Sequence, residues 1–413
     1  MTQNKSACRF CDSSLEHSFA DLGMSPLSNS YLKTEQINMM EPFFPLHAYV
    51  CKSCFLVQLE EYQSPDEIFS DYAYFSSYSE SWLRHAKSYV EKMVLRFKLG
   101  VNSQVVEIAS NDGYLLQYFV ERDVPVLGVE PAANVAEVAR DKGVETIVKF
   151  FGVQTARELA QDNRKADLIA GNNVLAHVPD INDFVKGLSI LLKDNGVITM
   201  EFPHLARLMA ETQFDTIYHE HFSYLSLIAV EKIFAAHGLV IFDVEELPTH
   251  GGSLRIYACH SGSRLDEVGS TVVDLRNYEF EQGLAVIETY DKFAEQVKEA
   301  KRKLLEFLIR EKRSGKSIVA YGAAAKGNTL LNYCGVRTDF IEYAVDRSRY
   351  KQGMYLPGTH IPIYSPDKIK ETRPDYILIL PWNLKNEIME QMAYVREWGG
   401  KFVTPIPEVT VYQ

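Results

Sequence analysis

The sequence VVEIASNDG (residues 105–113) joins a short β-branched run to a turn of small and polar residues, and a helical pattern of apolar residues starts at Tyr114. We interpret this stretch as a strand, a tight loop and the N-terminus of a helix. Backbone N–H groups at such a junction can approach a ligand closely. The stretch predicts an α/β fold with a ligand site at this loop, although an ordinary strand-to-helix connection has a similar pattern.

An acid on the next strand indicates what this ligand could be. The candidate strand from Pro125 to Val129 ends in Glu130, where an acid can bind two ribose hydroxyls. The carboxylates of Glu107 and Asp112 would repel a pyrophosphate, which disfavours NAD and favours S-adenosylmethionine. Ala109 stands where many such loops have glycine. The predicted cofactor-binding residues of this part are Glu107, Ala109, Asn111, Asp112, Gly113 and Glu130.

Length and charge limit the classes of function. The chain has 413 residues, of which 46% are hydrophobic, enough for two or three domains. The formal net charge of −12 is spread along the sequence without a long basic run, which disfavours nucleic-acid binding. No signal-peptide pattern and no apolar stretch near twenty residues occurs, so we expect a cytoplasmic protein without a membrane span.

The cysteines predict a metal site. Four of the six form two pairs with the same spacing: Cys8, Cys11, Cys51 and Cys54. Two such pairs can hold one zinc ion tetrahedrally, and a cytosolic chain rarely oxidises them to disulfides. All-cysteine ligation leaves no open position, so we expect a structural zinc ribbon. Cys259 and Cys334 stand alone in apolar surroundings and are expected in the core.

An aromatic cluster, YAYFSSY (residues 72–78), follows the second cysteine pair. Its rings could stack on a sugar and its hydroxyls could form hydrogen bonds, which makes Tyr72 and Tyr74 candidate substrate-binding residues. A packed linker between domains could have the same composition, and both interpretations stay open.

Between residues 82 and 203, helical patterns alternate with short apolar strands, which predicts a parallel doubly wound sheet. The strand from Ala166 to Ala170 opens onto a polar loop that contains Asn172, Asn173 and His177. Open sheets bind ligands at this edge, so the two asparagines are candidate cofactor contacts. His177 is either a cofactor or substrate contact or a surface histidine that caps a helix.

The densest polar segment is YHEHFSYLS (residues 218–226). Two histidines flanking a glutamate, with a tyrosine on each side, offer a general base, an orienting carboxylate and hydroxyl donors. A metal site is the rival interpretation, but His-x-His without an evident third ligand is a weak metal signal. Further on, His250, Gly251 and Gly252 form a turn at which the backbone can close on a ligand.

The last third repeats the strand, glycine turn and helix pattern at SIVAYGAAAKGNT (residues 317–329), after a helical bridge from Asp274 to Arg310. This pattern predicts a second Rossmann-like unit. Its helix N-terminus with Lys326 could bind the pyrophosphate of a nucleotide sugar, the alternative being a packing domain without a ligand. Asp346, at the tip of the next strand, is a hydroxyl contact or an ordinary loop acid.

Taken together, these motifs resemble the deoxysugar 3-C-methyltransferases, S-adenosylmethionine enzymes that methylate nucleotide-linked keto-deoxysugars such as those leading to tetronitrose or mycarose. The resemblance rests on the four cysteines, the loop ending at Gly113 with Glu130, the segment from Tyr218 to Phe222, HGG (residues 250–252) and YGAAAK (residues 321–326). It implies that the acceptor is C-3 of a dTDP-4-keto-6-deoxysugar. It also implies the catalytic residues, with the first as the base: His221, Tyr218, Glu220, His177 and Tyr74.

The chemistry of such a reaction agrees with these residue types. A proton next to a ketone can be removed because the carbanion is delocalised as an enolate, which needs a base of near-neutral pKa and donors for the oxyanion. Histidine suits the first task and a tyrosine hydroxyl the second, with Glu220 expected to orient the imidazole. The expected substrate contacts are Tyr72, Tyr74, His250, Gly251 and Lys326.

We therefore predict an α/β protein with three consecutive parts. These are a zinc ribbon with an aromatic linker (1–80), a class I methyltransferase domain that binds S-adenosylmethionine (81–285) and a second Rossmann-like domain (286–413). The alternatives are a methyltransferase for an oxygen or nitrogen of another metabolite, and a zinc-ribbon binding module without activity. The oligomeric state stays open, with a monomer as one possibility.

Overall fold

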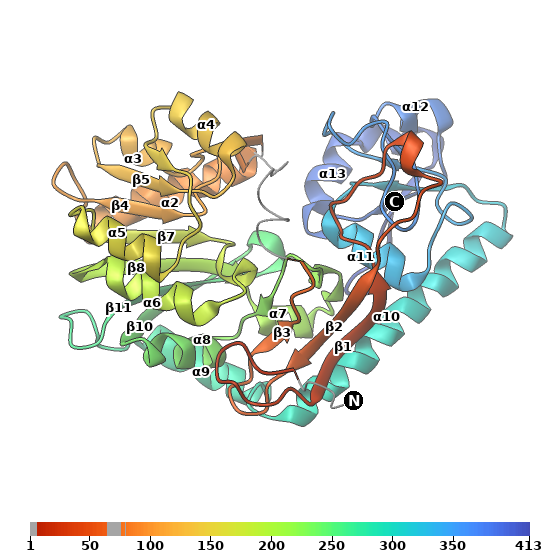
Figure 1. Ribbon diagram of the computed structural model, residues 1–413. Coiled ribbons are helices and arrows are strands. Elements are labelled where there is room, and N and C mark those ends of the chain that lie inside the picture. The colour runs from red at the N-terminus through yellow and green to blue at the C-terminus, as the bar shows by residue number, and fades with distance from the viewer. Residues whose placement is uncertain (1–5, 64–75, 79) are drawn as a thin grey trace. The chain divides into compact units, whose positions relative to one another are not determined.

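The computed structural model describes residues 6–63, 76–78 and 80–413, and the chain divides into two compact units (Figure 1). Unit 1 consists of Met1–Leu15, Cys51–Leu205 and Phe222–Ala285, and unit 2 of Glu16–Val50, Ala206–His221 and Val286–Gln413. Unit 2 thus includes residues 16–50 and 206–221 as well as the C-terminal part of the chain. Tyr72 and Tyr74 lie outside the described residues.

Unit 1 is built on a seven-stranded sheet, which confirms the predicted doubly wound architecture. Five neighbouring strands run parallel, and β11 pairs antiparallel with both β8 and β10. The order across the sheet is β10 (Leu239–Leu247), β11 (Ser253–His260), β8 (Leu192–Pro203), β7 (Ala166–Asn172), β4 (Val105–Ile108), β5 (Val126–Val129) and β6 (Thr146–Ile147).

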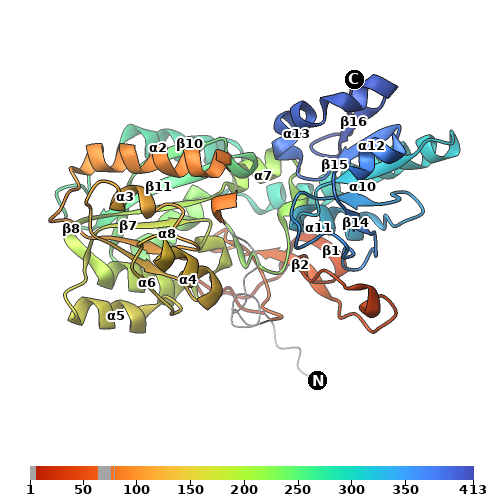
Figure 2. The same cartoon turned by 90° about the horizontal axis from the view of Figure 1, so that it is seen from above.

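Helices cover both faces of this sheet. Figure 2 shows α2 (Glu80–Phe97) and α3 (Gln117–Val120) on one face, and α5 (Val153–Gln161) and α6 (Ile181–Leu191) on the other. The buried residues of α2 are Ala86, Tyr89, Val90 and Met93. Because they follow one another at a helical spacing, they lie on one side of the helix. Unit 1 also contains α4 (Ala133–Asp141), α8 (Leu227–Ala236), α9 (Ser270–Glu281) and a short antiparallel pair of β3 (Val57–Leu59) and β9 (Ser223–Tyr224).

Unit 2 has its own mostly parallel sheet, as predicted for a second Rossmann-like unit. Only β17 runs antiparallel to its neighbour. The order is β14 (Ile363–Tyr364), β13 (Ala344–Val345), β12 (Ile318–Tyr321), β15 (Tyr376–Ile379), β16 (Lys401–Thr404) and β17 (Thr410–Tyr412). Its helices are α7 (Leu205–Ala210), α10 (Ile287–Arg313), α11 (Ala325–Cys334), α12 (Lys368–Thr372) and α13 (Lys385–Gln391).

A hairpin of β1 (His17–Ser25) and β2 (Phe44–Val50) joins unit 2 through the long helix α10 (Figure 1). The ring of Phe19 stacks on Phe293 at 4.5 Å and meets Tyr290 edge-on at 6.0 Å. The predicted helical bridge from Asp274 to Arg310 is in fact two helices, because the chain turns between α9 and α10 at Gly283, whose φ is +79°. None of the described helices is both long and apolar enough to cross a membrane.

Candidate active site

The four predicted zinc ligands come together in unit 1. Their Sγ atoms all lie within 4.8 Å of one another, with 3.6 Å between Cys8 and Cys54 and 3.5 Å between Cys11 and Cys51. Tetrahedral zinc with bonds of about 2.3 Å separates its sulfurs by roughly 3.8 Å, so the cluster fits this ion. Both knuckles use the same turn, in which Asp12 N–H donates to Cys8 O and Phe55 N–H to Cys51 O. Cys259 and Cys334 are buried outside the cluster, as expected.

The loop after β4 is held in a conformation unusual for side-chain-bearing residues. Ala109 and Asn111 have φ values of +56° and +49°, in the left-handed region. Gly113 also has positive φ, and a Cβ there would lie 3.1 Å from Val144 and 3.2 Å from Ala139. Glycine is required at this point because the loop packs closely on α4 and its following turn.

Glu130 fastens this loop to the end of β5. One carboxylate oxygen accepts the Asn111 N–H at 2.9 Å, and the other accepts the Ala132 N–H at 2.9 Å. Burial raises the pKa of Glu130, while these two backbone donors lower it. Each oxygen retains acceptor capacity, so binding of ribose hydroxyls stays a prediction compatible with this geometry.

We predict that Glu130→Gln weakens S-adenosylmethionine binding by about 10- to 100-fold, the loss expected for hydrogen bonds to a charged acceptor. The amide nitrogen of glutamine would also face a backbone donor in place of an acceptor. Isothermal calorimetry measures the change, with the exposed Glu121→Gln as the control. A dissociation constant within about twofold of wild type would contradict the assignment.

Two further acids lie beneath the same loop. Glu107 is fully buried, and burial raises the pKa of its carboxyl well above the usual range. Asp112 is also fully buried, and Lys142 Nζ donates to its side chain at 3.1 Å. Both acids lie at the loop that the sequence assigns to S-adenosylmethionine, and this assignment stays a prediction.

An aromatic group adjoins the two predicted cofactor asparagines. Asn172 donates to the Tyr114 hydroxyl at 3.2 Å, and the Asn173 amide meets His250 Nε2 at 3.1 Å. The indole of Trp82 stacks on Tyr114 at 5.9 Å and meets His250 edge-on at 5.2 Å. His250 and Gly251, predicted as substrate contacts, therefore lie in unit 1, with His250 beside Asn173.

A buried ionic network supports this aromatic group. Arg255 donates to Glu201 at 2.6 Å across neighbouring strands, and His85 and Thr249 each meet the same carboxylate at 2.9 Å. Burial opposes the charge on Glu201, but His85 and Arg255 lower its pKa to about 2. The network fixes the strand ends from which Thr249 and His250 project.

His177 precedes helix α6 in the chain, and its role stays a prediction. The N-cap of α6 is Asp180, whose carboxylate accepts the Asp183 N–H at 2.9 Å, so His177 does not cap that helix. His177 ends a short 3-10 turn that follows the polar loop. Phe222 N–H donates to Ala176 O at 2.8 Å, which fixes this turn beside the chain that follows His221.

The segment from Tyr218 to His221 belongs to unit 2. Nδ1 of His221 donates to the Thr216 carbonyl at 2.9 Å, and the Tyr218 ring lies 4.0 Å from the imidazole, tilted by 34°. Glu220 instead accepts from Asn29 at 2.6 Å, and burial raises the pKa of its carboxyl. The sequence assigned the orienting role to Glu220, whereas the Thr216 carbonyl accepts the Nδ1 hydrogen bond.

His219 differs from its neighbour in surroundings. Its Nε2 lies 3.2 Å from Pro45 O, its ring meets Phe44 edge-on, and burial lowers its pKa. Among the described residues, the four cysteines are the only cluster of three or more potential metal ligands. Residues 218–226 contribute no ligand to that cluster.

Lys326 lies in the first turn of α11, within a polar group the sequence did not reveal. Its ammonium donates to Asn383 at 2.9 Å and lies 4.9 Å from the Trp382 ring centre. Trp382 in turn donates to Asp215 at 2.7 Å, and Asp215 is fully buried. Burial raises the pKa of Asp215 to about 6 and lowers that of Lys326.

We predict that Asp215→Asn stabilises the protein at pH 8 by about 1–3 kcal/mol, because asparagine can accept from Trp382 without a buried charge. The folded pKa lies above the unfolded one, so wild-type stability falls as pH rises from about 4 to 6, and below pH 4 the two proteins should match. Urea unfolding at pH 3.5 and 8 measures this. Equal stability at pH 8, or a gain in the exposed control Asp141→Asn, would contradict it.

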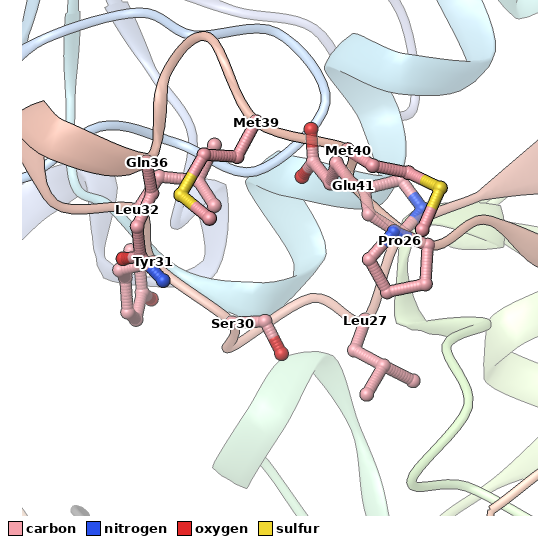
Figure 3. Close-up of a pocket in the computed structure, with 10 residues that line it drawn as sticks. Pro26, Leu27, Ser30, Tyr31, Leu32, Gln36, Met39, Met40 and Glu41 are labelled. Carbon is pink, nitrogen blue, oxygen red and sulfur yellow. The ribbon is translucent and has the colours of Figure 1, made fainter.

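The segment between β1 and β2 reaches the turn before α11. Tyr31 donates to Ala323 O at 2.6 Å, and Lys351 donates to the same oxygen at 2.8 Å. A pocket of about 240 Å³ opens beside Tyr31, with Gln36, Met39 and Met40 around it (Figure 3). Hydroxyl, ammonium and apolar groups thus adjoin the N-terminus of α11.

Sequence reasoning missed several of these residues. Glu201 and Arg255 carry a signal, since each is a charged residue within a buried and mostly apolar stretch of strand. Asp215, Trp382 and Asn29 carry none, because their partners lie more than a hundred residues away.

Comparison with protein-family models gives three consecutive matches. A model described as a zinc-binding domain matches residues 8–69, a methyltransferase domain matches 82–244, and a C-methyltransferase C-terminal domain matches 248–407. The C-methyltransferase NovU of Streptomyces niveus is 37% identical over 404 residues, which cover 98% of this chain and 96% of that protein. The similarity therefore spans both units.

Other similarities are partial. The ubiquinone biosynthesis O-methyltransferase of Pelagibacter ubique is 28% identical over 97 residues, or 24% of this chain and 40% of that protein. The solved structure of magnesium protoporphyrin IX methyltransferase from Synechocystis, with bound S-adenosylmethionine, superposes with a TM-score of 0.34 at 16% identity, covering 43% of this chain and 79% of that one.

Proposed function

Because the chain belongs to the family of S-adenosylmethionine-dependent C-methyltransferases, we propose that it methylates C-3 of a nucleotide-linked 4-keto-deoxysugar, with dTDP as the expected nucleotide. The similarity to the C-methyltransferase NovU, which extends along nearly the whole chain, supports carbon as the acceptor. The sugar and its nucleotide rest on the motifs described above. Zinc has a structural role in this proposal, since all four ligands are cysteines.

The observation that carries the proposal is the setting of His221. A carbonyl can only accept a hydrogen bond, so the contact with Thr216 O keeps the proton on Nδ1 and leaves the basic lone pair on Nε2. A neutral imidazole with a fixed tautomer is suited to take a proton from carbon next to a ketone. His221 thus removes the C-3 proton, and the electron pair of that C–H bond moves into the enolate.

Other residues assist this step in the proposal. Tyr218, stacked against His221, supplies a hydroxyl donor to the enolate oxygen. Bound S-adenosylmethionine supplies the methyl group that C-3 takes up. Glu107, Asp112 and Glu130 would hold the cofactor at the loop after β4, beside the stacked rings of Trp82 and Tyr114.

The nucleotide part of the substrate is assigned to unit 2. The N-terminus of α11 has no side-chain cap, so its N–H groups and Lys326 suit a pyrophosphate. The pocket beside Tyr31 lies next to the same turn and has the size and apolar lining to take a pyrimidine ring. Asp215 offsets part of the positive charge that this site would otherwise hold.

Proton NMR in heavy water tests the proposal. A dTDP-4-keto-6-deoxysugar is incubated with enzyme first alone and then with S-adenosylmethionine. We expect loss of the C-3 proton signal in the first stage and growth of a methyl singlet in the second. Methylation without exchange, appearing on oxygen or nitrogen, would replace the proposal by heteroatom methylation, and no reaction across several such sugars would contradict the substrate class.

A further inference from the structure

Arg9 links the first zinc knuckle to two other parts of unit 1. It lies between Cys8 and Cys11 in the sequence, and its guanidinium donates from Nη1 to Pro179 O at 2.9 Å and from Nη2 to Leu59 O. Its Cζ also lies 5.4 Å from the centre of the Phe222 ring. A planar fork that meets two carbonyls and one aromatic face is a specific arrangement that lysine cannot reproduce.

The contacted residues adjoin both proposed catalytic histidines. Pro179 comes two residues after His177, and Phe222 comes directly after His221. The backbone of Phe222 is held on both sides, since its N–H donates to Ala176 O at 2.8 Å and its carbonyl accepts Leu59 N–H at 3.0 Å. Arg9 therefore touches the end of each segment that carries a histidine.

The other end of Arg9 is fixed at the cysteine cluster. Its backbone N–H donates to Gln58 Oε1 at 2.8 Å, and Gln58 Nε2 donates to Cys8 Sγ at 3.2 Å. Asn182 adds a hydrogen bond of 2.9 Å to Phe10 O. The knuckle is thus a rigid base from which the guanidinium projects.

We propose that Arg9 is a positioning residue for the proton-transfer step, holding the Pro179 and Phe222 ends of the His177 and His221 segments against the cysteine cluster. This inference rests on the proposed function, in which those histidines act on the substrate. A misplacement of about 1 Å near a reacting group can cost about 10²-fold in rate. The zinc ribbon would then set catalytic geometry as well as stabilise the fold.

A matched control separates positioning from simple attachment of the ribbon. Lys232 attaches the second knuckle to α8, donating to Ser53 O at 3.3 Å and lying 4.8 Å from the Phe55 ring centre. Among the described residues, its hydrogen bond and its ring contact go to Ser53 and Phe55 and not to Phe222 or Pro179. The comparison is therefore Arg9→Met against Lys232→Met.

The first readout needs no substrate. Imidazole signals in proton–nitrogen NMR are assigned with His177→Gln and His221→Gln, and zinc and S-adenosylmethionine binding are measured on the same samples. We expect both signals to move in Arg9→Met and to stay in place in Lys232→Met, with about one zinc per chain in both. Unchanged signals in Arg9→Met would overturn the proposal. If Arg9→Met loses zinc, Arg9→Lys replaces it under the same criteria.

The second readout uses the C-3 exchange reaction in heavy water. We expect Arg9→Met to lower its rate by about 10- to 100-fold with KM within about threefold of wild type. Phe222→Leu should not add its full effect to that of Arg9→Met, because both act through one contact. Fully additive effects, or a loss confined to KM, would overturn the proposal. If wild type shows no exchange, the proposed substrate is wrong, while the imidazole signals still decide the role of Arg9.

Discussion

His221→Gln should lower the rate of C-3 proton exchange and the rate of methyl transfer together, each by about 10²–10⁴-fold, the contribution typical of a general base. Glutamine can donate to the Thr216 carbonyl in place of Nδ1 but has no basic nitrogen for the proton. The affinity for S-adenosylmethionine should not change, because the proposal assigns cofactor binding to Glu107, Asp112 and Glu130 and not to His221. Exchange is measured by NMR in heavy water and methyl transfer from labelled cofactor.

His219→Gln is the matched control for this prediction, since it makes the same change two residues away. His219 contacts Pro45 O and Phe44, the first two residues of β2. We expect exchange within about threefold of wild type in this variant and a modest loss of stability. Equal losses in the two variants, or exchange that persists in His221→Gln, would contradict His221 as the base.

The two acids at strand tips show what sequence can and cannot predict. From its place after a strand, the sequence predicts a cofactor contact for Glu130, whereas for Asp346 it allows either a hydroxyl contact or an ordinary loop acid. In the structure, each of the two acids accepts hydrogen bonds from two backbone N–H groups. Asp346 accepts those of Ala323 and Ser348, and Glu130 accepts those of Asn111 and Ala132. Each acid therefore fixes the turn at the head of a helix, a role that a pattern of strands and turns does not reveal.

Local patterns were enough for the elements and the cysteine cluster. Strand, loop and helix follow from residue spacing within about fifteen positions, and two Cys-x-x-Cys pairs define a metal site by composition alone. The grouping of residues 16–50 and 206–221 into unit 2 depends on contacts such as Asn29 with Glu220 and Trp382 with Asp215. No periodicity links positions so far apart, so this part of the candidate site could not be predicted.

The zinc cluster gives the second large expected effect. Cys51→Ser should abolish stoichiometric zinc binding and lower the stability of unit 1, because a structural zinc contributes folding free energy of about 10–16 kcal/mol in small isolated zinc-binding domains. Cys51 is fully buried, and its loss leaves three cysteine ligands, one fewer than a structural zinc site requires. Because most of unit 1 has its own core, we expect local unfolding of the ribbon, measured as zinc content, a lower melting temperature and faster proteolysis.

Cys259→Ala serves as the control, since Cys259 is a buried cysteine of β11 outside the cluster. It should keep about one zinc per chain and lose only about 1 kcal/mol. Full zinc content in Cys51→Ser would contradict the ligand assignment. Cys51→Ser should also slow C-3 exchange at least as much as Arg9→Met, because a loosened knuckle cannot hold the Arg9 guanidinium against Phe222. Loss of zinc with unchanged exchange would mean that the ribbon stabilises the fold without affecting the reaction.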